Sequence, residues 1–186
     1  MTKSFFNAAK NAAESSLFNF NPFTISNKTI QHNNVKYITK YKGGDALKLN
    51  AYLREDSELP DDLMKISIGL DNELNMMPIY KGAVYRTLGF SRDIDYQKFL
   101  NEWRQGEIVT TKAYTSASKG NLYSDPTTMK YGVLMKLNSI TGRNIENIGL
   151  NESEILFPRG TKFAVRKTEL QKTNTGSILF VAADEV

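Results

Sequence analysis

The chain has 186 residues, 40% of them hydrophobic and 24% charged, which suits one globular domain with a core and is too little for two of ordinary size. It has no cysteine and a single histidine, His32, which excludes disulfides, thiolate metal sites, cysteine nucleophiles and metal sites that need two imidazoles. The net charge of +4 is not gathered into a block, so it suits an anionic cosubstrate or an acidic partner, and nucleic acid is not expected.

The first 34 residues differ from the rest in their pattern of apolar and polar residues. Apolar side chains at helical spacing predict an amphipathic helix within residues 4–18, and residues 27–34 are polar. We therefore expect residues 1–34 to be a helical or extended appendage and 35–186 to be the main domain. No secretory signal is visible, and no apolar stretch approaches the roughly 20 residues of a membrane-spanning helix.

Three helices are predicted in the first half of the main domain. A turn at residues 43–45 leads into a helix with Asp45 as its N-cap. A second helix follows Pro60 and carries leucines and an isoleucine at helical spacing. A third contains Trp103 and ends at Gly106.

The rest of the main domain reads mostly as strands separated by two long loops. β-Branched and alternating residues predict strands at 82–88, 107–118, 131–137, 154–157, 161–167 and 176–183. Helices followed by strands indicate an α+β domain built on antiparallel sheets, not a βαβ fold. Neither the glycine pattern of a Rossmann site nor that of a P-loop is present.

Three short motifs carry groups suited to chemistry. Arg86 lies in an apolar strand, where a guanidinium needs an anion or a carboxylate. Ser116 and Ser118 place two hydroxyls on one face of a strand. Glu152 and Glu154 share one face at the start of a strand, which suits proton transfer and stabilisation of an oxocarbenium ion. Taken singly, each also fits a structural role: a salt bridge, an edge strand and a solvated turn.

In this order, the motifs resemble those of the mono-ADP-ribosyltransferase toxins and effectors of the Arg-Ser-Glu class. The resemblance covers residues 35–183 and includes LNAYLR at 49–54, VYR at 84–86 and ESEILFPRGTKF at 152–163. It implies a split β-sandwich of two antiparallel sheets flanked by helices, with NAD held between the sheets.

The resemblance also implies which residues bind NAD. Arg86 would hold its phosphates and ribose, because a guanidinium binds phosphate oxygens at two points. Arg54 would add a phosphate contact or lie on the surface. The other implied NAD-binding residues carry hydroxyl, amide or aromatic groups: Tyr85, Ser116, Ser118, Asn50, Tyr52 and Tyr123, the last in the loop 119–128, where it would stack near nicotinamide.

Three residues are implied to be catalytic. Glu154 would bind the nicotinamide-ribose hydroxyl and stabilise positive charge as the glycosidic bond breaks, and Ser116 would hydrogen-bond toward it. Glu152 would engage the acceptor; a Glu at this position favours arginine, which is protonated at neutral pH. Ala117 replaces the usual central threonine, whose side chain should face away. The loop 145–151 lacks the aromatic residue that many relatives use to recognise the acceptor.

The resemblance therefore implies an NAD-dependent protein mono-ADP-ribosyltransferase that needs no metal. Its partner would be a target protein, such as a host cytoskeletal protein or GTPase, modified most readily on arginine. The chain would be a bacterial or phage toxin or effector, secreted or injected, and active in the target-cell cytoplasm. Three alternatives remain open: an NAD glycohydrolase that uses water, a transferase for another side chain, and a non-catalytic NAD-binding or interaction module.

Overall fold

A computed structural model describes residues 35–120, 124–148 and 153–186. Its helical segments are α2 (Lys36–Lys40), the wide π-type turn η2 (Tyr41–Asp45), α3 (Ala46–Glu55), α4 (Asp61–Met76), α5 (Asp93–Glu102) and the short η3 (Pro126–Thr128). The three predicted helices correspond to α3, α4 and α5, whereas α2 and η2 were not predicted. Asp45 is the N-cap residue of α3, as expected, although its side chain makes no capping hydrogen bond.

The described strands are β1 (Gly82–Phe90), β2 (Ile108–Thr110), β3 (Thr115–Ser118), β4 (Tyr131–Ser139), β5 (Arg143–Asn144), β6 (Glu154–Phe157), β7 (Lys162–Lys172) and β8 (Ser177–Glu185). They pair in the order β2-β7-β8-β4-β1-β3-β6-β5. The α+β class is therefore confirmed. The predicted strand at 107–118 is two short strands, β2 and β3, and the second long loop contains β5.

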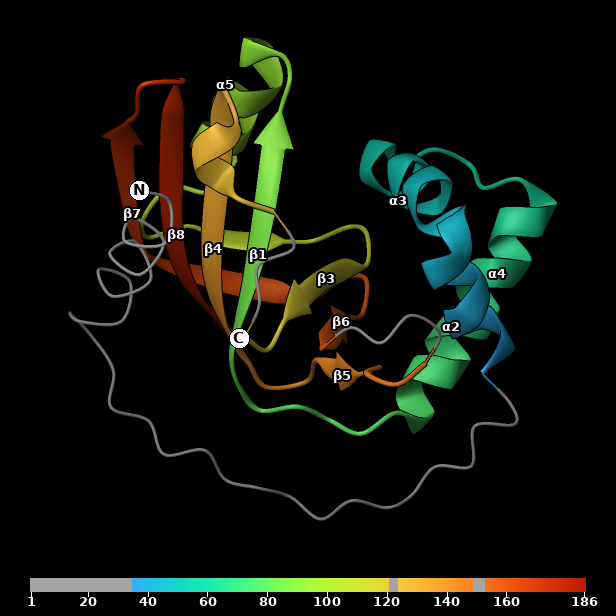
Figure 1. The fold of residues 1–186 in the computed structure, drawn as a ribbon. Helices are drawn as coiled ribbons and strands as arrows, with labels where there is room; N and C mark the ends of the chain where they lie inside the picture. Colours follow the sequence, from blue (N-terminus) through green and yellow to red (C-terminus); the bar gives the residue numbers. More distant parts are fainter. Residues whose placement is uncertain (1–34, 121–123, 149–152) are drawn as a thin grey trace.

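One junction divides this sheet into two parts. Strands β1 and β3 are matched at a single pair, Tyr85 with Ser118, whereas β1 and β4 are paired along their whole length. The long strands β7, β8, β4 and β1 consequently diverge from β3, β6 and β5 (Figure 1). The expected two sheets are thus two parts of one hydrogen-bonded sheet, joined at Tyr85.

One strand pair departs from the antiparallel expectation. Strand β8 lies parallel to β4 from Tyr131 opposite Ser177 to Asn138 opposite Asp184. Between these two strands the chain passes through β5, β6 and β7 and returns by the β7–β8 hairpin. Because of this excursion β8 re-enters the sheet beside β4 in the same direction, a connection that sequence periodicity does not encode.

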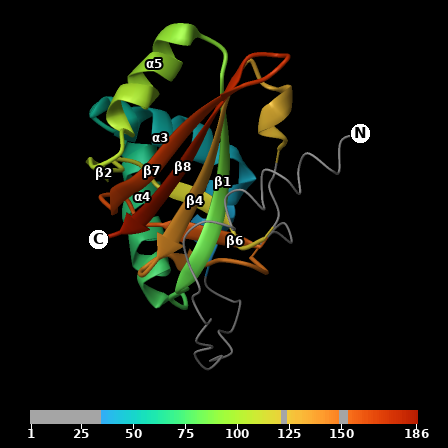
Figure 2. The ribbon, with the colours of Figure 1, turned by 90° about the vertical axis from the view of Figure 1, so that its left-hand side faces the viewer.

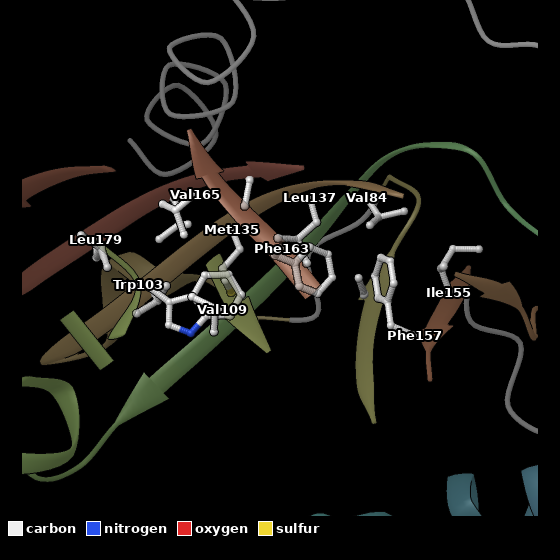
Figure 3. Close-up of a cluster of buried hydrophobic side chains, with 14 of the residues drawn as sticks. Val84, Trp103, Val109, Met135, Leu137, Ile155, Phe157, Phe163, Val165 and Leu179 are labelled. Carbon is white, nitrogen blue, oxygen red and sulfur yellow. The ribbon is translucent and has the colours of Figure 1, made fainter. Parts of the chain in front are cut away.

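Two buried clusters fill the molecule. The first packs α5 and its aromatic residues against the long strands, and Trp103, Met135, Phe157 and Phe163 are among its members (Figure 3). The second packs α2, α3 and α4 against the short strands. Figure 1 shows α5 apart from α3 and α4, and in Figure 2, turned by 90°, α3 and α4 lie behind the long strands.

Strand β6 separates the two clusters. Ile155 and Phe157 belong to the first and Leu156 to the second, because alternate side chains point to opposite faces of a strand. Glu154 shares the face of Leu156, so its carboxylate points toward the side of the helices α2–α4.

Candidate functional site

Sequence motifs that are far apart in the chain meet on the adjoining strands β1, β3 and β6. Ser118 lies opposite Glu154, and Tyr85 lies opposite Ser118. Ser116 pairs with Leu156, so both serines share the face of Glu154. The arginine, serine and glutamate motifs are therefore neighbours in space.

The predicted orientation of Ala117 is confirmed. It pairs with Ile155 and is fully buried in the first cluster, on the face away from the two serines. A threonine hydroxyl at this position would face the apolar core, so its absence removes no group from the serine face.

Arg86 ties β1 to β3 at the junction. It pairs with the buried Met135 on β4, so its side chain begins on an apolar face, and its Nη1 donates to the Ser116 carbonyl at 2.5 Å. Burial lowers the pKa of Arg86 from its ordinary value, and the nearby Arg54 guanidinium lowers it further, whereas Tyr41 and Glu154 act in the opposite direction. Arginine starts from so high a pKa that the group stays charged at neutral pH.

Glu154 is a buried carboxylate with a cation beside it. The residue is 5% exposed, and its Oε2 lies 3.2 Å from Nζ of Lys42. A buried charge without a counter-ion is costly, so this ion pair allows an ionised carboxylate on an inward face. Lys42 comes from η2 and was absent from the sequence-based site.

Tyr41, the residue before Lys42, was also missed. Its hydroxyl accepts a hydrogen bond from Nδ2 of Asn50 at 2.9 Å, and its ring packs edge-on against Tyr114. Burial raises the pKa of Tyr41, while hydrogen bonds with Asn50 and Ser116 lower it. The phenol therefore lies between α3 and the serine strand and stays protonated at neutral pH.

The remaining predicted residues on α3 have different environments. The Oδ1 of Asn50 is buried and has no hydrogen-bond partner among the described residues, so it remains a free acceptor. Tyr52 is half-buried and packs against the second cluster. Arg54 is exposed. The structure thus brings Asn50 to the site and gives Tyr52 a packing contact.

A buried carboxylate on α4 holds the segment that carries Tyr41 and Lys42. Glu73 is 6% exposed and accepts hydrogen bonds from the backbone N–H groups of Tyr37 and Ile38 at 2.8–3.0 Å. These donors lie at the start of α2, where a helix leaves N–H groups unsatisfied. Within η2 the chain turns toward α3 at Gly44, whose φ of +129° favours glycine.

A second polar link attaches α4 to the short strands. The hydroxyl of Tyr114 donates to Oδ1 of Asp71 at 2.5 Å, and Arg159 donates to Oδ2 of the same carboxylate at 2.6 Å. Burial, followed by the bond to Asp71, raises the pKa of Tyr114. Tyr114 also packs on Tyr41, so this link helps to hold Tyr41 in place beside the site.

Two predicted site residues, Glu152 and Tyr123, lie outside the described residues. Within the described ranges, no three histidine, cysteine, aspartate or glutamate side chains gather as a metal site would require. No helix of those ranges is long and apolar enough to cross a membrane.

Comparison with protein families and curated proteins gave two matches. The model of the ADP-ribosyltransferase exoenzyme family matches residues 15–186. A protein of Mycobacterium avium (strain 104), provisionally named NAD(+)–arginine ADP-ribosyltransferase Mav, is 30% identical over 130 residues, which are 69% of this chain. The chain spans only 15% of the length of that relative.

Solved structures with the same fold include two bacterial proteins. The truncated type III effector XopAI of Xanthomonas axonopodis pv. citri matches with a TM-score of 0.66 and 20% identity, over 85% of this chain and 68% of that one. The catalytic domain of VahC from Aeromonas hydrophila matches with a TM-score of 0.65 and 16% identity, over 86% of this chain and 100% of that one. At these identities the likeness establishes the fold.

Proposed function

We propose, from the premise that the chain belongs to the ADP-ribosyltransferase exoenzyme family, that it transfers ADP-ribose from NAD to a side chain of a target protein and releases nicotinamide. The observation that carries this proposal is the buried carboxylate of Glu154, set opposite Ser118 on the strand next to Arg86. The reaction needs a negative charge where a cation develops and a positive charge where the dinucleotide phosphates bind.

The cations of the site suit the phosphates of NAD. The guanidinium of Arg54 is close enough to disfavour the charged form of Arg86. An anion between them would relieve this repulsion, and a guanidinium can bind a phosphate at two oxygens. In our proposal Arg86 is the principal phosphate ligand and Arg54 assists it.

Polar groups around these cations suit the rest of the dinucleotide. The buried Oδ1 of Asn50 can accept a hydrogen bond from a hydroxyl or an amide of NAD. Ser116 and Ser118 offer hydroxyls on the face of Glu154, and Tyr85 lies opposite Ser118. We propose that these four residues line the NAD site, and that Tyr123 stacks near the nicotinamide.

Glu154 supplies the electrostatic part of the chemistry. When the glycosidic bond breaks, positive charge develops on the ribose, and a fixed carboxylate in a buried site stabilises it more strongly than water would. Glu154 also accepts a hydrogen bond from a ribose hydroxyl. No metal is required, since the leaving nicotinamide is neutral once the bond has broken.

The acceptor is proposed to be arginine. Glu152 would orient its guanidinium and take up a proton, which arginine does not lose unaided because its pKa lies far above neutral pH. The provisional name of the Mycobacterium avium relative agrees with this choice. We propose a secreted or injected bacterial effector that acts in the cytoplasm of the target cell; XopAI, a structural relative, is a type III effector.

Incubation of the protein with labelled NAD and a cell lysate tests this function. We expect labelled protein bands, sensitive to treatments that cleave ADP-ribosyl-arginine, and a loss of about 10²- to 10³-fold in rate for Glu154→Gln. Lysates without a labelled band for the parent protein would contradict transfer. If the rate of nicotinamide release is the same with and without lysate and is unchanged by Glu152→Gln, the protein is instead an NAD glycohydrolase.

A further inference from the structure

The ion pair between Lys42 and Glu154 joins a helical turn to the strand that carries the proposed catalytic carboxylate. Nζ of Lys42 lies 3.2 Å from Oε2 of Glu154, and the two side chains are only 4% and 7% exposed. A pair so shielded from solvent is little weakened by salt, and its geometry constrains both partners.

The backbone that presents Lys42 is held on both sides. Before it, Glu73 binds the first N–H groups of α2, and after it, Gly44 turns the chain into α3. Next to it, Tyr41 is buried and hydrogen-bonded to Asn50. The ammonium of Lys42 is therefore delivered to Glu154 from a fixed position.

The contact engages one carboxylate oxygen. A carboxylate has two oxygens and about four acceptor sites, so the Lys42 contact at Oε2 restrains the group while acceptor sites remain for other partners. A pair that served stability alone would be replaceable by apolar side chains at little cost. Holding an ionised carboxylate in one orientation inside the protein does require a buried cation.

We propose that Lys42 is a positioning residue for Glu154: it holds Oε2 so that Oε1 is aimed at the hydroxyl of the bound nicotinamide ribose. This inference rests on the proposed function, because it assigns Lys42 a part in the same site. Lys42 acts through the carboxylate and touches no reacting atom.

The test measures kcat and KM for nicotinamide release from NAD in Lys42→Met, which keeps the length of the side chain and removes its charge. A carboxylate released from its position should lower kcat by about 10²-fold, the effect of a misplacement near 1 Å, with KM changed less than about threefold, since Arg86 still binds the phosphates. Lys42→Arg should recover much of the lost kcat. Lys40→Met is the matched control: Lys40 is exposed on α2 and should behave as the parent.

A double-mutant cycle separates positioning from a general loss of structure. In a Glu154→Gln background, Lys42→Met should cause little further loss of kcat, because the carboxylate that it positions is gone. The same fold-loss in both backgrounds, or a Lys42→Met variant with the parent kcat, would overturn the inference. If Lys42→Met does not fold, as judged by thermal melting, Lys42→Gln takes its place in the cycle.

The proposed function and this inference fail in different ways. A parent protein that releases no nicotinamide contradicts the function itself. An active parent, together with an equally active Lys42→Met, contradicts only the role of Lys42.

Discussion

At the scale of single residues, the site contains buried charged groups, and each would be destabilising without a partner. Arg86 begins on an apolar face and Glu154 is buried on another, and neither arrangement is stable without partners. Arg86 has the Ser116 carbonyl and Glu154 has Lys42. Because each charge is held by its partner, its position is fixed before a ligand binds. Electrostatic catalysis depends on such preorganised charges.

The identity of the cation at position 86 should matter as much as its charge. Arg86→Lys keeps the charge but loses the fork that reaches both the Ser116 carbonyl and a phosphate. Losing one charge-assisted hydrogen bond costs about 1.5–3 kcal/mol, so the Kd for NAD should rise about 10- to 100-fold. Calorimetric titration with NAD measures this.

Arg166→Lys is the control for that experiment, since Arg166 is exposed and pairs with Asp184 on the long strands. We expect this variant to bind NAD as the parent does. Equal affinities for Arg86→Lys and the parent would contradict a two-point phosphate contact at Arg86.

At the scale of elements, the segment from α2 to α3 decides which side chains reach the catalytic strand. Residues 43–45 read as a turn before a helix, and the turn is present. The sequence did not reveal that the preceding residues are helical, because the cap of α2 is Glu73, a side chain from α4. The position of Tyr41 and Lys42 in the site therefore depends on the contact between α4 and the start of α2, which are distant in the chain.

The turn offers a comparison of two adjacent glycines. Gly44 has a φ of +129°, whereas Gly43 does not have positive φ, and a Cβ at either would meet no atom within 4 Å. Gly44→Ala should therefore cost about 1–2 kcal/mol of unfolding free energy through backbone strain, and Gly43→Ala should be neutral or slightly stabilising. Denaturant unfolding of the two variants checks this, and equal stabilities would contradict strain at Gly44.

At the scale of the whole molecule, two cores are joined by a narrow strand junction and a few polar links. The β1–β3 junction is a single residue pair, so the helices α2–α4 depend on other contacts to stay in register with the sheet. The link from Tyr114 through Asp71 to Arg159 is one such contact. It connects the residue before β3 to α4 and to the turn after β6.

This link predicts how stability depends on pH. The pKa of Tyr114 is raised in the folded protein, so its stabilisation is fully present below the unfolded value of about 10 and is lost as pH rises above it. The free energy of unfolding should fall above pH 10. Tyr114→Phe should be less stable at neutral pH by about 1.5–3 kcal/mol, the worth of a hydrogen bond to a charged group. Its free energy of unfolding should also fall less between pH 10 and 11 than that of the parent. Thermal melts from pH 7 to 11 measure both effects, and parallel curves would contradict the assignment.

The sequence by itself determined the elements that carry the chemistry. Side chains repeat every 3.6 residues in a helix and every two in a strand. This periodicity predicts the helices α3, α4 and α5 and the strands that carry Arg86, Ser116 and Glu154. The order of the motifs also indicated the family that the comparison confirms. These signals are local, or depend on the order of residues alone.

Only the tertiary structure decided which groups surround Glu154 and how the strands are joined. Lys42 pairs with Glu154, and Tyr41 packs on Tyr114. Glu73 binds the start of α2. Each contact joins residues far apart in the chain, and no spacing rule relates them. The parallel pairing of β8 with β4 likewise depends on the path of the intervening strands. The physical reason is common to both: a buried charge takes its partner from whatever side chain the packed fold places beside it, and that choice is made in space.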